Sequence, residues 1–205
     1  MTFEQAASIP SAGLLAVQGL GDEDEIKLGD NILINGAGGS VGTLAVQIAK
    51  YYGAEVTAVD SEMKFDMLRS LGADHLIDYT KEDYTKTGKR YDRIVDNVAL
   101  RSVDDYKEAL NPKGKYVMVG GKVSTILKIF LRGPKILKEE GKKLGLLIWK
   151  PNRKEDIDFL LELIESGKVS PVIDRSFSLS ETAAAFKHFI EGHPLGKVII
   201  KVCDD

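Results

Sequence analysis

The sequence predicts an α/β protein built around a mostly parallel β-sheet. Between residues 31 and 119, short apolar runs alternate with segments of helical periodicity, the pattern of stacked βα units. A glycine-rich turn, Gly36–Gly42, separates the first apolar run from the first helical segment. A tight turn of this kind between a strand and a helix is typical of sheets that bind nucleotides.

Five short apolar segments predict the strands of this sheet, and a sixth is a further candidate. The predicted strands are residues 31–35, 55–59, 75–78, 93–97 and 115–119, and the candidate is 144–149. After Pro171, residues 172–173 form a short extended piece, and 197–202 are a final strand.

Helical periodicity fills the connections between these strands. One apolar face is expected on the helix after the glycine turn, formed by Val41, Leu44, Ala45, Ile48 and Ala49 and ended by Gly53. The next helix carries Met63, Met67, Leu68 and Leu71, and a third starts at the capping residue Ser102. Two more helices are predicted, one ended by Gly167 and one capped by Ser180 and ended by Gly192.

Residues 122–154 differ from the rest of the chain in charge. This basic segment holds ten Lys and Arg residues against two Glu, a net charge of +8, whereas the whole chain carries −3. Its apolar residues predict an amphipathic helix broken at Gly133–Pro134. A basic amphipathic helix can lie on an anionic membrane. We favour the alternative that it is a solvated face over the core or a cover over a cleft.

Composition narrows the class of protein further. A mild acidic balance of 28 basic and 31 acidic residues argues against a nucleic-acid partner. The single cysteine, Cys203, cannot form an internal disulfide or a cysteine-based metal site. The first ten residues do not resemble a signal peptide, and no apolar run is long enough to span a bilayer. We therefore expect a soluble cytoplasmic protein.

The glycine turn predicts a dinucleotide site. Ala37, Gly39 and Gly42 occupy the positions that need a tight turn, close approach of a pyrophosphate to the backbone, and close packing of helix on sheet. Free N–H groups at the helix start can then bind the diphosphate. Asp60, at the end of the second strand, can accept hydrogen bonds from the adenosine ribose.

Other chemistries lack the residues they need. The turn has no lysine of a phosphate-binding P-loop, and the chain has neither a hydrolase Gly-x-Ser-x-Gly elbow nor a Tyr-x-x-x-Lys pair. His75, His188 and His193 do not have the spacing of metal ligands. An S-adenosylmethionine-dependent methyltransferase remains an alternative, because it also uses a glycine turn and a following acidic residue.

Six segments occur in the order found in the medium-chain dehydrogenase/reductase superfamily, and the sequence most resembles its zinc-independent quinone oxidoreductase (zeta-crystallin-like) branch. These segments are residues 9–16, 35–42, 71–79, 96–98, 119–121 and 196–200. They match only the second part of that family's chain. The resemblance therefore implies that an N-terminal GroES-like domain, which supplies most substrate contacts in the family, is absent here.

The resemblance implies a Rossmann fold, a doubly wound six-stranded parallel sheet in the order 3-2-1-4-5-6 with helices on both faces, and NAD(P)(H) as the cofactor. It implies that the pyrophosphate binds at Gly39, Ser40, Val41 and Gly42. Lys64 and Tyr79 match positions that contact the adenosine 2′-phosphate, Asn97 and Gly120 match positions along the nicotinamide half, and Lys197 matches a residue near the entrance to the site.

Two departures from the family affect the expected chemistry. Asp60 stands where NADPH-using relatives carry a small or neutral residue, so NAD(H) is slightly favoured. No cysteine lies at residues 11–14, where the zinc-dependent relatives place one, and this implies zinc-independent chemistry without a bound metal.

The expected function is hydride transfer between a nicotinamide and a quinone or other α,β-unsaturated carbonyl, and no acid–base residue is assigned. We expect residues 1–22 to lead in from the missing domain, 23–150 to bind NAD(P), and 151–205 to complete the fold and contact that domain. A non-catalytic dinucleotide-binding module is an alternative. Self-association, as a homodimer or larger, is expected through the edge at 144–149.

Overall fold

A computed structural model describes residues 1–21, 26–192 and 194–202. Three features named in the sequence analysis lie outside these described residues: the predicted boundary between residues 22 and 23, and the residues His193 and Cys203. The helices are α1 (Phe3–Ser8), α2 (Pro10–Leu20), α3 (Ser40–Tyr51), α4 (Phe65–Ser70), α5 (Val103–Glu108), α6 (Val123–Glu140), α7 (Lys154–Glu165) and α8 (Thr182–Ile190). The strands are β1 (Asn31–Asn35), β2 (Glu55–Asp60), β3 (His75–Asp78), β4 (Tyr91–Asp96), β5 (Leu110–Met118), β6 (Lys143–Leu146), β7 (Ile173–Ser178) and β8 (Lys197–Lys201).

The main sheet has six parallel strands in the order β3-β2-β1-β4-β5-β6, which confirms the predicted fold class and strand order. Asn35 at the end of β1 is paired with Val59 on one side and with Asp96 on the other. The carboxyl ends of β2, β1 and β4 therefore meet at one edge of the sheet. In a doubly wound sheet, ligands bind at this edge.

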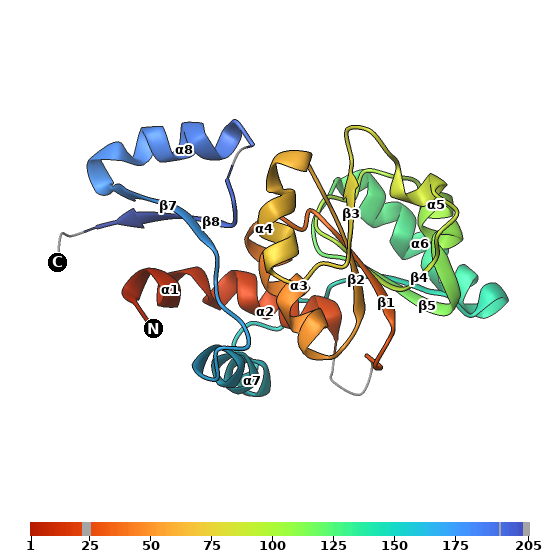
Figure 1. Cartoon of the computed structure of the whole chain (residues 1–205). Coiled ribbons are helices and arrows are strands. Elements are labelled where there is room, and N and C mark those ends of the chain that lie inside the picture. Colours follow the sequence, from red (N-terminus) through yellow and green to blue (C-terminus); the bar gives the residue numbers. More distant parts are fainter. Residues whose placement is uncertain (22–25, 193, 203–205) are drawn as a thin grey trace.

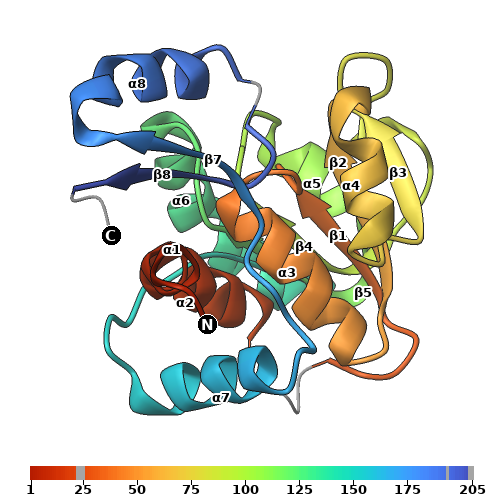
Figure 2. The same cartoon turned by 60° about the vertical axis from the view of Figure 1, so that its left-hand side comes forward.

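Helices cover both faces of the sheet, and each face has its own apolar core (Figure 2). One core packs α2, α3 and α7 on the sheet and includes Leu20, Leu44 and Leu160. The other packs α5 and α6 and includes Tyr106 and Ile129. Because α2 contributes to the first core, residues 10–20 are part of the sheet's packing.

The predicted break in the basic segment is wrong, because α6 runs unbroken from Val123 to Glu140 through Gly133 and Pro134. A Cβ atom on Gly133 would lie 2.6 Å from the Leu144 carbonyl oxygen. The glycine therefore allows the helix to approach β6 and does not end it. The sixth strand is confirmed at residues 143–146.

The predicted cap of the last helix is also wrong. Ser178, and not Ser180, forms a capping box with Glu181, at the start of a short 3₁₀ turn (Leu179–Glu181) that leads into α8. Ser178 ends β7, so the strand and the turn share one residue.

The C-terminal elements form a separate unit beside the sheet (Figure 1). β7 and β8 pair in parallel as a two-stranded sheet, and α8 packs beside them. An ion pair of 2.6 Å between Glu4 of α1 and Lys201 of β8 joins the two ends of the chain. In the described part of the chain, no helix is long and apolar enough to cross a membrane.

Candidate functional site

The glycine turn follows β1 directly and ends where α3 begins. Gly36 has a φ of +73°, a conformation that glycine adopts without steric cost. A Cβ atom on Gly42 would lie 2.3 Å from the Gly36 carbonyl oxygen and 2.5 Å from Ala37. Gly42 is therefore required for packing the helix start against the turn, as its place in the motif predicts.

Gly39, in contrast, is not required by the fold. It precedes α3 with extended backbone angles of −86° and 175°, and no side chain caps the helix there. A Cβ atom on Gly39 would meet only the Gly36 carbonyl oxygen, at an ordinary contact distance of 3.5 Å. The absent side chain leaves open space at the start of a twelve-residue helix, whose first N–H groups have no partner within the helix. This arrangement fits a diphosphate.

Asp60 and Lys64 form a buried ion pair at the end of β2. The Asp60 carboxylate accepts hydrogen bonds from the Gly38 N–H at 2.7 Å and the Ser61 N–H at 2.9 Å, and Lys64 Nζ lies 3.4 Å from its Oδ1. Both residues are buried. The methylene chain of Lys64 lies over the glycine turn, because a Cβ on Gly38 would fall 2.3 Å from Lys64 Cδ. The charge of Asp60 is therefore balanced within the chain.

Tyr79 completes this corner of the site. It follows β3, its side chain is exposed, and its N–H donates to the Asp60 carbonyl oxygen at 3.4 Å. The structure therefore brings together Asp60, Lys64 and Tyr79.

The second corner lies at the ends of β4 and β5. The side-chain amide of Asn97 donates to the Asn35 carbonyl oxygen at 2.9 Å, and its Oδ1 is buried without a hydrogen-bond partner among the described residues. A Cβ on Gly120 would lie 2.6 Å from the Asn97 carbonyl oxygen, so glycine permits this close approach. An orphaned buried acceptor at a sheet edge fits a ligand that donates a hydrogen bond.

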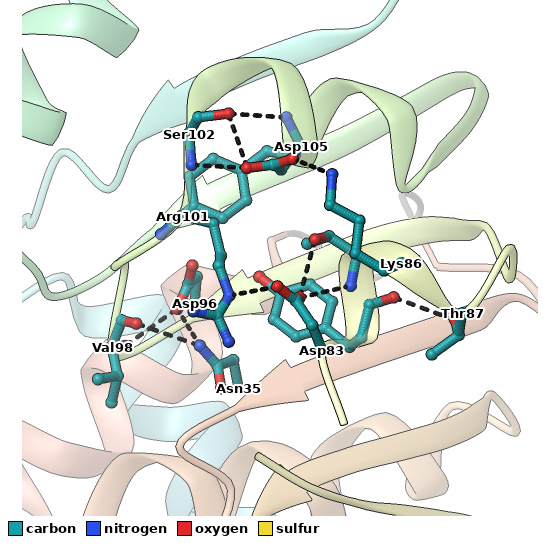
Figure 3. Close-up of polar contacts among 12 residues, drawn as sticks. Asn35, Asp83, Lys86, Thr87, Asp96, Val98, Arg101, Ser102 and Asp105 are labelled. Carbon is teal, nitrogen blue, oxygen red and sulfur yellow. Dashed lines mark hydrogen bonds and ion pairs between the residues drawn. The ribbon is translucent and has the colours of Figure 1, made fainter. Parts of the chain in front are cut away.

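Asp96, beneath Asn97, was not identified as a site residue from the sequence. Its carboxylate accepts hydrogen bonds from Asn35 Nδ2 at 2.7 Å and the Val98 N–H at 3.0 Å (Figure 3). The Tyr116 hydroxyl also donates to this carboxylate, at 2.8 Å. Burial raises the pKa of the Asp96 carboxyl, against the lowering effect of these donors. Burial also raises the pKa of Tyr106, whose ring stacks on Tyr116, to about 12. The network holds the turn that carries Asn97.

Gly196 is a second residue that sequence reasoning missed. Its N–H donates to the Gly38 carbonyl oxygen at 3.0 Å, and its own carbonyl accepts from the Ser40 hydroxyl at 3.1 Å. Its place just before Lys197, in the matched segment 196–200, is the signal that could have identified it. Its φ of +93° is one that glycine adopts without steric cost. Lys197 is therefore held beside the glycine turn by the residue before it.

The structure thus gathers the sequence-predicted residues around the carboxyl edge of the sheet. From the glycine turn come Ala37, Gly39, Ser40, Val41 and Gly42; from the strand ends come Asp60, Lys64, Tyr79, Asn97 and Gly120; and Lys197 starts β8. Within the described ranges, no group of three or more His, Cys, Asp or Glu side chains could hold a metal ion.

Comparisons with known proteins agree with this geometry. The sequence profile of the family described as zinc-binding dehydrogenase matches residues 71–200. A chloroplast envelope quinone oxidoreductase homolog from Arabidopsis thaliana is 32% identical over 96% of this chain and 61% of its own length. An NADPH-dependent alkenal/one oxidoreductase of the same species is 36% identical over 97% of this chain and 47% of its own length.

Among solved structures, the quinone oxidoreductase from Coxiella burnetii superposes with a TM-score of 0.82 and 31% identity, over 99% of this chain and 62% of that one. The chain thus spans about half to two thirds of the length of the relatives it matches. Profile, relatives and fold together place the chain in the medium-chain dehydrogenase/reductase superfamily, on its quinone oxidoreductase branch, where it matches the cofactor-binding half.

Proposed function

We propose that this chain is the cofactor-binding half of an NAD(P)H-dependent oxidoreductase that acts on a quinone or another α,β-unsaturated carbonyl. The observation that carries the proposal is Gly39, a glycine with no steric role in the fold at the start of α3. The names of the relatives, quinone and alkenal/one oxidoreductases, support the substrate class.

The residues at the sheet edge have separate roles in this proposal. Backbone N–H groups of the segment from Gly39 to Gly42 bind the diphosphate, with Ala37 shaping the turn. Asn97 and Gly120 line the nicotinamide half, where the free Oδ1 of Asn97 can accept a hydrogen bond. Lys197 lies beside the turn, at the side from which an acceptor would enter.

A bound nicotinamide would supply the hydride, and the chain's own task is to orient it and exclude water. No described residue at this edge is assigned as an acid or base. Asp96 holds a turn from beneath and is fully buried, so it is a positioning residue and not a catalytic one. Zinc-independent chemistry stays a prediction from the sequence.

The pair of Asp60 and Lys64 bears on the choice between NAD(H) and NADP(H). A slight preference for NAD(H) follows if the charge of Asp60 repels a 2′-phosphate. Because Lys64 lies beside Asp60 and balances that charge, the pair also supports use of NADP(H). We propose that the chain binds both cofactors, with Lys64 and Tyr79 at the 2′ position.

The C-terminal unit supports the proposed contact of residues 151–205 with a further domain. A two-stranded sheet is marginally stable alone, and most of α8 is exposed, including Phe186 and Phe189. That residues 1–22 lead in from this further domain also stays a prediction. We expect the 205-residue chain to bind cofactor and to oxidise NAD(P)H with simple quinones near background, because an open nicotinamide face lacks oriented proximity.

A non-catalytic dinucleotide-binding module stays the second candidate from the sequence. Self-association through the edge strand β6 and the cytoplasmic location stay predictions. The names of the two Arabidopsis thaliana relatives place those proteins in the chloroplast, so they do not confirm the cytoplasmic prediction.

Replacing Gly39 tests the site. A Cβ at position 39 makes no clash inside the chain, so we expect Gly39→Val to fold and to lose at least tenfold in affinity for NADH, or ~1.4 kcal/mol. Gly145→Val is the matched control, since a Cβ there meets no atom within 4 Å and lies in β6, away from the turn. Calorimetry measures the NADH affinity of both variants. Unchanged affinity in a folded Gly39→Val variant would contradict the site.

A further inference from the structure

Helix α3 holds the C-terminal unit, formed by β7, α8 and β8, at two places on one face. At the first place, which we call the Gln47 contact, Gln47 Nε2 donates to the Ser170 carbonyl oxygen at 2.9 Å and the Ser170 N–H donates to Gln47 Oε1 at 2.9 Å. At the second place, the Ser40 contact, the Ser40 hydroxyl donates to the Gly196 carbonyl oxygen at 3.1 Å. Ser40 and Gln47 are about two helical turns apart, so they lie on the same side of α3. The segment from α7 to β7 runs along this side (Figure 2).

The Gln47 contact is a fixed point in the linker that joins α7 to β7, residues 166–172. Gln47 Nε2 also donates to the Thr43 carbonyl oxygen at 2.9 Å, so both the helix and the linker orient this amide. Gly167, between α7 and Ser170, has a φ of +70°, and a Cβ atom there would meet no atom within 4 Å. A cavity of about 360 Å³ borders Gly167 and Ser170. A glycine with open space next to a fixed residue fits a hinge.

The Ser40 contact, in contrast, depends on a group that the proposed cofactor also needs. Ser40 is the first residue of α3, where the proposed diphosphate binds. A hydroxyl has one proton to donate, and a charged phosphate oxygen is a stronger acceptor than the neutral carbonyl of Gly196. A bound diphosphate therefore takes the Ser40 hydrogen bond from Gly196.

We infer that a bound dinucleotide releases the loop at Gly196 while Gln47 keeps Ser170 in place, so that the C-terminal unit pivots about the Gln47 contact. Because this pivot needs the diphosphate at the start of α3, it rests on the proposed function. The Lys197 N–H donates to the Val172 carbonyl oxygen at 2.9 Å, so the start of β8 stays attached to the linker before β7 and the unit moves as one body. We expect α1, which packs on β7 and β8, to move with it. Gln47 is a positioning residue, since it acts on the unit through Ser170.

Backbone amide exchange, followed by NMR on the 205-residue chain, reports on both contacts. The Gly196 N–H donates to the Gly38 carbonyl oxygen at 3.0 Å, and the Ser170 N–H takes part in the Gln47 contact. With saturating NADH, the exchange rate at Gly196 should rise about fivefold, the effect of losing one ordinary hydrogen bond, whereas that at Ser170 should not change. The Lys150 N–H is the matched control amide, because it donates to a glutamine side chain of α2 at 3.0 Å, away from the turn.

Three variants separate the two contacts. Ser40→Ala should raise the exchange rate at Gly196 about fivefold without NADH, and saturating NADH should then add nothing. Gln47→Leu should raise the exchange rate at Ser170 and leave the response of Gly196 to NADH in place. Ser176→Ala, at an exposed position of β7, is the matched control for the serine substitution and should respond to NADH as the unaltered chain does.

Calorimetry on the same samples measures the NADH affinity and so separates the pivot from the proposed function. NADH that binds while exchange at Gly196 is unchanged or slower would overturn the pivot and leave the cofactor site intact. A rise at Ser170 as large as that at Gly196, or a response to NADH that persists in Ser40→Ala, would also overturn it. If NADH does not bind, both the cofactor site and the pivot are wrong. The two amides of the unaltered chain test the pivot even if Ser40→Ala does not fold.

Discussion

Two aspartates end the two strands that flank β1, and their surroundings differ. Asp60 ends β2 and Asp96 ends β4, and both are buried. Asp60 has a lysine beside it and two backbone N–H donors. Asp96 is hydrogen-bonded by an amide, a backbone N–H and a tyrosine hydroxyl, all of them neutral.

The difference shows how one sheet edge can carry two kinds of binding corner. At the Asp60 corner, Lys64 balances the charge of the carboxylate. Burial raises the pKa of the Asp96 carboxyl, and the donors that lower it are neutral groups rather than a cation. Asp60 and Asp96 hold the same position at a strand end, so the difference in their electrostatic environment comes from the neighbouring side chains.

Removing Asp96 is expected to have the largest effect. Asp96→Ala leaves the Asn35 amide, the Val98 N–H and the Tyr116 hydroxyl without their acceptor, which should lower the free energy of unfolding by about 3 kcal/mol. Urea unfolding followed by circular dichroism measures this. Asp96→Asn keeps the shape and is expected to lose less; a loss as large as that of alanine would show that volume, not hydrogen bonding, matters there.

Removing the lysine should make the Asp60 corner selective. Lys64→Met leaves the Asp60 carboxylate without its counter-charge, so the affinity for NADPH should fall about tenfold, ~1.4 kcal/mol, with little change for NADH. Fluorescence titration with both cofactors gives the ratio. Lys89→Met, an exposed lysine in the loop before β4, is the control. Equal losses for both cofactors would mean that Lys64 does not distinguish them.

Much of this arrangement follows from the sequence, but its side-chain pairing does not. The strands at residues 31–35 and 55–60 were predictable because continuous apolar runs between turns are typical of buried parallel strands. The glycine turn was predictable because its spacing matches a dinucleotide-binding motif, in which packing requires Gly42 and Gly39 leaves space at the start of α3. Asp60 was predicted to face the ribose, whereas its pairing with Lys64 depends on how the chain turns after β2.

The Asp96 network depends on strand register, which the sequence does not specify. Asp96 pairs with Met118, and Tyr116 lies two residues earlier on the same face of β5. The unbroken α6 was mispredicted because a Gly-Pro step usually ends a helix, whereas here the glycine allows close contact with Leu144. The missed Asp96 network and the mispredicted break in α6 both depend on contacts between different elements, which the sequence pattern does not specify.

A single hydroxyl deletion gives a finer comparison. Tyr116→Phe removes one of the three donors to Asp96, and its loss should cost about 1 kcal/mol of unfolding free energy. The stacking of this ring on Tyr106 is kept. Denaturant titration of Tyr116→Phe and Asp96→Ala in parallel measures this loss of unfolding free energy. A cost equal to that of Asp96→Ala would show that the tyrosine alone supports the network.

The smallest effect is in the pH dependence of stability. Because burial raises the pKa of Asp96 above 3.8 in the folded chain, its stabilising contribution is complete below that value and is lost as the pH rises through the folded pKa. The unfolding free energy of the unaltered chain minus that of Asp96→Asn should therefore be smaller at pH 7 than at pH 4. Urea unfolding at the two pH values tests the sign, and an opposite trend would mean that the donors outweigh burial.

If the proposed dinucleotide binds at the glycine turn, the hydrogen bonds between Gly196 and that turn would link cofactor affinity to the position of the C-terminal unit. Gly196 contacts Gly38 and Ser40, while the residues that follow it form β8. A partner that shifts β8 must change these bonds, and by reciprocity a bound dinucleotide must change the affinity for that partner by the same factor. Two binding events on opposite sides of this turn would thus share one coupling free energy.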